Sequence, residues 1–192
     1  MNGSGAPGPL CRPIVLVGLM GAGKSSVGLR LASALGVEFI DSDDEIERAA
    51  NMTIPEIFST FGEPHFRSGE RRVIARLITE MPRVIATGGG AFMNAETRGT
   101  ISDGAVSVWL NADIDTLVSR TEGRTHRPLL ANGNPREILE GLIAERYPIY
   151  RLADVGVISK AGQTHEQMAA RIIAALAEHG AAFQEGPGRA QS

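Results

Sequence analysis

A glycine-rich segment near the amino terminus limits the possible folds of this chain more than any other feature. The segment Gly18–Ser25 reads GLMGAGKS and matches the phosphate-binding pattern G-x-x-x-x-G-K-[ST]. It follows the apolar, β-branched run Ile14–Val17 and precedes a helical pattern over Lys24–Leu35. A chance match in a chain of this composition is expected on the order of a few times per thousand, so an ordinary glycine-rich turn is a poor alternative. The sequence therefore predicts a strand–loop–helix unit that binds phosphate.

The residue types in this loop suit ATP. Glycines let backbone N–H groups turn inward around phosphate oxygens, and the start of the following helix adds its positive end. Lys24 can reach the β- and γ-phosphates, and the Ser25 hydroxyl can ligate Mg²⁺. We therefore predict ATP as the occupant, with Mg²⁺ beside it.

Alternating apolar runs and helical patterns repeat this unit along the chain. Four more strands are predicted at Val37–Ile40, Val84–Ala86, Val106–Leu110 and Val155–Ile158. Helices are predicted at Ile54–Ser59, Glu70–Met81, Asn94–Ser102, Ile114–Thr121 and Pro135–Tyr147, and a capping box formed by Thr164 and Gln167 starts a last helix. This alternation predicts an α/β fold with a parallel sheet of about five strands.

Length and tail composition predict one domain. The chain has 192 residues, of which 43% are hydrophobic, enough for one core and few for two. Residues 1–11 are predicted to be a flexible N-terminal tail because their start is rich in Gly, Pro and Ser, and residues 184–192 a flexible C-terminal tail because they lack apolar periodicity. The domain is expected over residues 12–183.

Charge and cysteine content exclude several classes of protein. The net charge of −3 offers no bulk attraction to nucleic acid or to an anionic membrane, and no apolar run approaches the roughly 20 residues that span a bilayer. The single cysteine, Cys11, cannot form an intrachain disulfide, which favours a cytoplasmic location. Without an exposed apolar stripe, a monomer is expected.

Two acidic residues, Asp41 and Asp43, close the second predicted strand at the sheet edge where ligands of α/β proteins bind. One carboxylate can face a metal ion through water while the other accepts a hydrogen bond from a substrate hydroxyl. Alternatively, Ser42 or Asp43 caps a helix that begins at Asp44 and plays no part in catalysis. The residues themselves leave both interpretations open.

Two further segments suit ligand binding. Arg67 follows a turn at residues 62–64, but its spacing from Glu70 is also typical of a simple surface ion pair. The glycine triplet in Thr87–Gly90 follows a strand and allows the backbone to approach a ligand closely, although a tight turn is the alternative.

The segment over about residues 122–134 is long, polar and basic, as a mobile lid over a ligand would be; a plain surface loop is the alternative. It contains Arg127, whose planar cation can meet charge that develops during phosphoryl transfer. The four histidines show no metal-ligand spacing, so no protein-only metal cluster is predicted.

Taken together, these motifs resemble those of shikimate kinases. The matching elements come in the family's order between about Pro13 and Ala175: the phosphate loop, the Asp41-Ser42-Asp43 pair, Gly62-Glu63 before Phe66-Arg67, Gly88-Gly89-Gly90-Ala91, Arg127-Pro128-Leu129-Leu130, and Arg146 before Tyr150. The resemblance implies a nucleoside-monophosphate-kinase-like fold, a P-loop three-layer α/β/α architecture with a five-stranded parallel sheet. It also implies transfer of the ATP γ-phosphate to the 3-hydroxyl of shikimate, a step toward chorismate and the aromatic amino acids.

The resemblance also implies a role for each matching residue. ATP would be held by Gly21, Ala22, Gly23, Lys24, Ser25, Ser26, Arg120 and Arg127, and Mg²⁺ by Ser25 with Asp41 acting through water. Shikimate would be bound by Asp43 at its hydroxyl, Arg67 and Arg146 at its carboxylate, and the Gly89 backbone beside its ring. Lys24, Asp43 and Arg127 would be the catalytic residues, and Gln163 would lie near the nucleotide.

Two alternative functions follow from the same phosphate loop. A related kinase for gluconate would share the fold, and a catalytically silent nucleotide-binding regulator would share the loop. The presence of Lys24, Asp43, Arg67 and Arg127 together favours an active enzyme.

Overall fold

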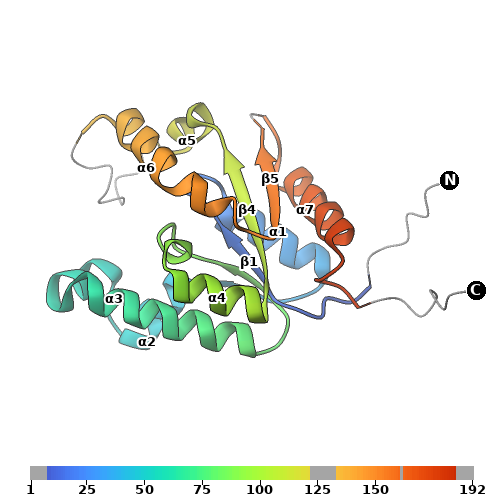
Figure 1. Cartoon of the computed structure of the whole chain (residues 1–192), viewed down its shortest axis with the longest axis horizontal. Coiled ribbons are helices and arrows are strands. Elements are labelled where there is room, and N and C mark those ends of the chain that lie inside the picture. The colour runs from blue at the N-terminus through green and yellow to red at the C-terminus, as the bar shows by residue number, and fades with distance from the viewer. Residues whose placement is uncertain (1–7, 122–132, 161, 185–192) are drawn as a thin grey trace, which may run out of the picture.

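The computed structural model describes residues 8–121, 133–160 and 162–184, which form a parallel sheet with helices on both faces (Figure 1). The sheet has five strands in the order β2-β3-β1-β4-β5, and every pair of neighbours is parallel. The strands are β1 (Ile14–Val17), β2 (Phe39–Asp41), β3 (Val84–Ala86), β4 (Val106–Ala112) and β5 (Val155–Ser159). The predicted fold class is confirmed.

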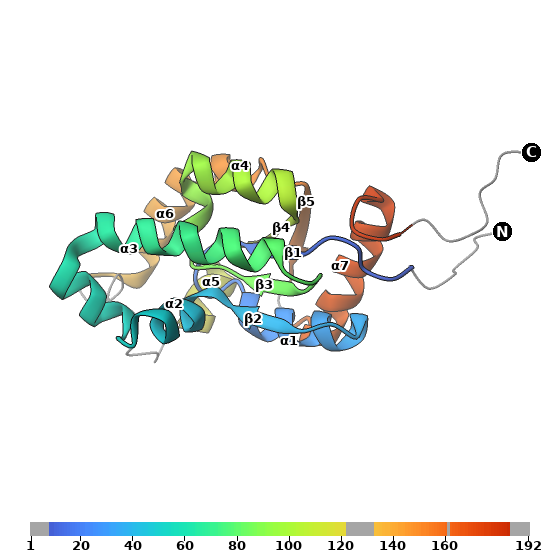
Figure 2. The same ribbon diagram turned by 90° about the horizontal axis from the view of Figure 1, so that it is seen from below.

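The helices form the two outer layers. Figure 2 shows α1 on one side of the sheet and α3 and α4 on the other, and α7 packs against α1. The helices are α1 (Lys24–Leu35), α2 (Ser42–Ala50), α3 (Ile54–Thr79), α4 (Ala95–Gly104), α5 (Ile114–Thr121), α6 (Pro135–Tyr150) and α7 (His165–His179), with a short 3₁₀ turn, η1 (Ala91–Met93). All four residues of β1 are buried because both faces are covered, which explains its continuous apolar sequence.

The second strand starts two residues later than predicted, for a local reason. Gly36 ends α1 in the left-handed conformation with φ 67°, and the N–H of Val37 donates to the carbonyl of Ala32. Val37 therefore belongs to the turn that closes α1 and is unavailable to the sheet.

Two helical regions also differ from the prediction. Ser42–Ala50 forms α2, which the sequence suggested only as the alternative to a catalytic role for Asp43. The predicted gap before Glu70 is helical from just after Gly62, where φ is 79° and ψ is 170°. Pro64 is tolerated because it lies in the first turn after this break, where no preceding helical carbonyl needs its N–H.

The strand order brings three loops to one edge of the sheet. The phosphate loop follows β1, the glycine triplet follows the adjacent β3, and Asp41 ends β2 on the other side of β3. Since parallel strands place their carboxyl ends together, these segments are neighbours although they are far apart in sequence.

The two ends of the described chain meet near the opposite edge. Leu10 forms an antiparallel bridge with Phe183, and the N–H of Gln184 donates to the carbonyl of Pro9 at 3.0 Å. The predicted tails fall largely on residues 1–7 and 185–192, outside the described part of the chain, and the domain limits stay a prediction. No helix among the described residues is both long and apolar enough to span a bilayer.

Candidate active site

The phosphate loop is shaped by left-handed glycines and close packing. Gly21 and Gly23 have φ values of 82° and 96°, in the region that L side chains rarely adopt. The side chain of Lys24 folds over the loop, and its Nζ donates to the carbonyl oxygens of Gly18 and Leu19 at 2.8 and 3.0 Å. The lysine charge is thus held at the mouth of the loop, where phosphate oxygens would bind.

Ser25 and Asp41 form the part of the site that suits a magnesium ion. Ser25 Oγ donates to Asp41 Oδ2 at 2.7 Å, which places two hard oxygen ligands side by side at the sheet edge. The described residues contain no group of three or more His, Cys, Asp or Glu side chains that could hold a metal. A hydroxyl and one carboxylate fit Mg²⁺ in the way common for ATP sites, where waters and phosphate oxygens supply the remaining ligands.

Asp41 also caps α2. Its Oδ1 accepts a hydrogen bond of 3.1 Å from the N–H of Asp43, which satisfies an otherwise unpaired donor of the first helical turn. The capping interpretation therefore holds, but for Asp41 rather than for Ser42 or Asp43. Because Asp41 serves both the helix and Ser25, the two interpretations are not exclusive.

Asp43 is partly buried and lies among other acids. Burial, reinforced by Asp41 and Glu70 and opposed by Lys24, raises the pKa of Asp43 to about 6. Its Oδ1 has no hydrogen-bond partner among the described residues. The carboxylate of Asp43 therefore has hydrogen-bonding capacity that the described residues leave unfilled.

The glycine triplet forms a wall against these side chains. A β-carbon on Gly88 would lie 2.9 Å from Asp43 Oδ1, and one on Gly90 would lie 2.7 Å from two guanidinium nitrogens of Arg67. At Gly89, the nearest heavy atom to such a β-carbon is the carbonyl oxygen of Gly18 in the phosphate loop, 3.5 Å away. The close-approach interpretation of the triplet fits these distances better than a plain tight turn does.

Arg67 is held by two glutamates. Its Nη1 donates to Glu70 Oε2 at 2.8 Å, and its Nε and Nη2 donate to Glu63 Oε1 at 3.2 and 3.1 Å. Glu70 is only 2% exposed, so the interpretation of this pair as a surface ion pair is wrong. Burial raises the pKa of Glu70, and the hydrogen bond and charge of Arg67 oppose that rise.

Arg146 approaches the same wall from α6. Its Nη1 donates to the carbonyl oxygen of Gly89 at 3.3 Å, and its buried Nε has no hydrogen-bond partner in the described part of the chain. The hydroxyl of Tyr150 donates to the same carbonyl. Tyr150 is fully buried and packs near Phe92 and Trp109, so it fixes the backbone on which Arg146 rests.

The remaining predicted ATP-site residues differ in their placement. Arg120 Nη1 donates to the carbonyl of Ala22 in the phosphate loop and to Ser159 Oγ, at 3.3 and 3.2 Å. Gln163 Oε1 accepts from Lys160 N and Arg171 Nη1, with no hydrogen bond to the loop. Arg127, and the predicted lid up to residue 132, lie outside the described residues.

Sequence reasoning missed two residues of this site. Glu70 was treated only as a partner of Arg67, although the three-residue spacing was the available signal for a shared helix face. The second is Tyr150, because no sequence pattern distinguishes a buried tyrosine that only packs from one that also donates to a carbonyl group of the site.

Comparisons with known proteins agree with this geometry. A model of the family described as shikimate kinase matches residues 20–177. A curated shikimate kinase of Rhodopseudomonas palustris is 54% identical over 168 residues, which make up 88% of this chain and 82% of the relative. A second, from Novosphingobium aromaticivorans, is 53% identical over 169 residues, 86% of this chain and 87% of the relative.

A solved structure gives the same result. Shikimate kinase from Acinetobacter baumannii in complex with shikimate superposes with a TM-score of 0.84 at 37% identity, covering 90% of this chain and 97% of that one. The family model and the two relatives each span most of the sequence. This chain therefore belongs to the shikimate kinase family.

Proposed function

We propose that the residues at this sheet edge transfer the γ-phosphate of ATP to the 3-hydroxyl of shikimate, giving shikimate 3-phosphate and ADP. The observation that carries the proposal is the convergence of a phosphate loop, a carboxylate with a buried, unpaired oxygen and two arginines on one glycine wall. Phosphoryl transfer needs positioning and neutralisation of charge more than covalent chemistry. These side chains supply both.

Residues on the β1 side of the wall bind the nucleotide. Backbone groups of Gly21, Ala22 and Gly23, together with the side chains of Ser25 and Ser26, surround the phosphates, while Lys24 exchanges its loop carbonyls for β- and γ-phosphate oxygens. Arg120, which already contacts the loop at Ala22, stacks near the adenine. Ser25, with Asp41 acting through water, would hold Mg²⁺, which when bound would supply charge neutralisation at the phosphates.

Asp43 prepares the acceptor. Its carboxylate accepts a hydrogen bond from the 3-hydroxyl, which aligns the hydroxyl oxygen with the γ-phosphorus. A pKa of about 6 leaves Asp43 ionised at neutral pH but more basic than an ordinary aspartate. The proton of the hydroxyl therefore has a nearby acceptor as the new bond forms.

Arg67 and Arg146 bind the carboxylate of shikimate. They contact adjacent residues of the glycine triplet, since Arg67 lies against Gly90 and Arg146 donates to the carbonyl of Gly89. Their guanidinium groups are kept in place by Glu63, Glu70 and the carbonyl of Gly89, so little side-chain freedom is lost when the substrate binds. The Gly89 backbone lies beside the substrate ring.

The lid completes the proposal. Residues 122–134 would close over both substrates, bring Arg127 to the transferring phosphoryl group and exclude water, which otherwise competes as acceptor. We also propose that the chain works as a monomer in the cytoplasm, where its exposed Cys11 stays reduced.

The test is an ADP-release assay with shikimate, with gluconate and with no acceptor. We expect ADP release with shikimate, and none with gluconate or without an acceptor. The Lys24→Ala variant should lose about 10³-fold in rate while remaining folded. Preference for gluconate would indicate the related kinase, and ATP binding without turnover would indicate the silent regulator.

A further inference from the structure

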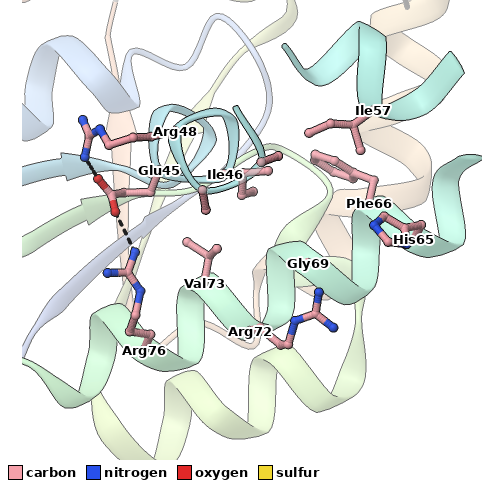
Figure 3. Close-up of a pocket in the computed structure, with 12 residues that line it drawn as sticks. Glu45, Ile46, Arg48, Ile57, His65, Phe66, Gly69, Arg72, Val73 and Arg76 are labelled. Atoms are coloured by element: carbon pink, nitrogen blue, oxygen red, sulfur yellow. Dashed lines mark hydrogen bonds and ion pairs between the residues drawn. The ribbon is translucent and has the colours of Figure 1, made fainter. Parts of the chain in front are cut away.

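A cavity of about 550 Å³ lies between α2 and α3, lined by residues that have no role in the site above (Figure 3). Its apolar lining consists mainly of four buried side chains, Ile46, Ile57, Phe66 and Val73. The volume falls in the range of small-molecule sites, about 300–1,000 Å³. The cavity is therefore large enough for a compact ligand of its own.

Gly69 keeps part of this cavity open. It lies within α3, where glycine costs roughly 0.5–1 kcal/mol relative to alanine. Its φ is not in the left-handed region, and a β-carbon there would meet no heavy atom within 4 Å. A larger side chain at this position would therefore extend into open space beside the cavity.

The rim of the cavity carries excess positive charge. Arg48 and Arg76 share the carboxylate of Glu45, as the dashed lines in Figure 3 show. Arg72 has no such partner: within the described residues its guanidinium donates only to Ser68 Oγ, at 3.3 Å, and no carboxylate lies within ion-pair distance. Arg76 also pairs with Glu80, at 3.5 Å. Arg72, one turn of α3 beyond Gly69, is therefore the guanidinium group of the lining that no described carboxylate pairs with.

We propose that this cavity binds a small aromatic monocarboxylate. A flat ring fits the space over Gly69, against Phe66 and Val73, and its carboxylate pairs with Arg72. An inorganic anion would leave the apolar lining uncovered, and an uncharged hydrocarbon would leave the charge of Arg72 unpaired. The cavity adjoins the substrate site, since the Arg67 guanidinium lies over the Phe66 ring at 5.2 Å from its centroid, but none of the residues assigned to shikimate lines the cavity.

The experiment uses 3-phenylpropanoate as the probe, titrated calorimetrically into the full-length protein with saturating shikimate present to occupy the Arg67 and Arg146 pair. We expect saturable binding with a dissociation constant on the order of a millimolar, and much weaker binding of the uncharged 3-phenylpropan-1-ol. Arg72→Gln should weaken binding of the probe at least about tenfold. Gly69→Leu should abolish it by filling the cavity.

Arg71→Gln is the matched control, because Arg71 is the neighbouring residue and pairs instead with Glu96 at 3.3 Å. It should bind the probe like the unmodified protein. Circular dichroism checks that each variant folds, and if Gly69→Leu does not, Arg72→Gln still decides the question. No detectable binding, equal binding by Arg72→Gln and the unmodified protein, or displacement of the probe by shikimate would each overturn the proposal.

Discussion

Gly88 and Asp43 are so close that the hydrogen of the glycine is the largest substituent that fits between them. A β-carbon at Gly88 would lie 2.9 Å from Asp43 Oδ1 and 3.2 Å from Glu70 Oε1. Both oxygens are buried and lack hydrogen-bond partners among the described residues. The two carboxylates are therefore positioned by the backbone that faces them.

Gly88→Ala should lower turnover at least about tenfold with little loss of stability. The atoms that must move are the ends of two side chains, which can shift, but displacing a reacting group by a fraction of an ångström is costly for catalysis. Gly99→Ala is the control, because nothing lies within 4 Å of a β-carbon at that position in α4. Steady-state kinetics and thermal melting of both variants check this; wild-type turnover in Gly88→Ala would contradict the proposed position of Asp43.

Asp43→Asn should lower kcat about 10²- to 10⁴-fold and also stabilise the fold at neutral pH. Because the folded-state pKa of about 6 lies above the ordinary 3.8, ionisation of Asp43 costs stability progressively as the pH rises from 3.8 to about 6, and the full cost is present above that. The amide removes this cost, at most about 3 kcal/mol. Chemical denaturation at pH 7.5 and pH 4 should show the stabilisation at pH 7.5 alone. A less stable variant at pH 7.5 would refute the raised pKa.

The pH dependence of kcat/KM for shikimate should report the same group. Protonation of Asp43 removes the hydroxyl acceptor, so kcat/KM should fall as the pH drops below about 6, approaching tenfold per pH unit. The residual activity of Asp43→Asn should lack this acidic limb. An acidic limb near pH 4 in the unmodified enzyme would show that Asp43 titrates as an ordinary aspartate.

Arg146→Ala and Arg67→Ala should each weaken shikimate binding about 10- to 150-fold, equivalent to about 1.5–3 kcal/mol for a charge-assisted contact. Arg71→Ala, next to the binding face but paired with Glu96, serves as control. The two variants should differ in stability. Arg67→Ala leaves the buried carboxylate of Glu70 unpaired, and adding Glu70→Gln should restore part of the lost melting temperature. Unchanged shikimate affinity in both single variants would exclude them as the carboxylate site.

Arg127→Ala should lower kcat strongly while changing ADP affinity much less, because ADP lacks the γ-phosphate that this arginine is proposed to meet. Single-turnover kinetics together with ADP titration separate the two effects. Equal losses in turnover and in ADP affinity would place Arg127 on the α- or β-phosphate instead.

The sequence predicts best those parts of the structure where several neighbouring sequence features indicate the same element. The phosphate loop combines a motif with its flanking strand and helix, and β1 is apolar throughout because helices cover both faces of the sheet. In contrast, α2 has one buried aliphatic side chain, Ile46, among many acids. With nine residues held by the cap at Asp41 and by packing on α3, this helix offers too few large apolar side chains for its pattern to be recognised in the sequence.

The buried charged residues are the part of the site that could not be predicted from the sequence. The sequence suggests a surface position for Glu70 because glutamate is rarely buried. Its burial depends on its ion pair with Arg67 and on the close approach of the Gly88 backbone. Those contacts join α3 to a loop that follows β3. Only the arrangement of the folded chain reveals them.

The pairing of Leu10 with Phe183 has a consequence for how this enzyme tolerates being joined to other chains. A β-carbon on Gly8 would lie 2.5 Å from the carbonyl oxygen of Gln184, so the two ends of the described chain are adjacent. They lie before the start of β1, whereas ATP and shikimate are expected beyond its end. Fusion partners attached at either terminus are therefore directed away from the substrates, and a short peptide linking the two ends would suit a circular permutant whose new termini open elsewhere.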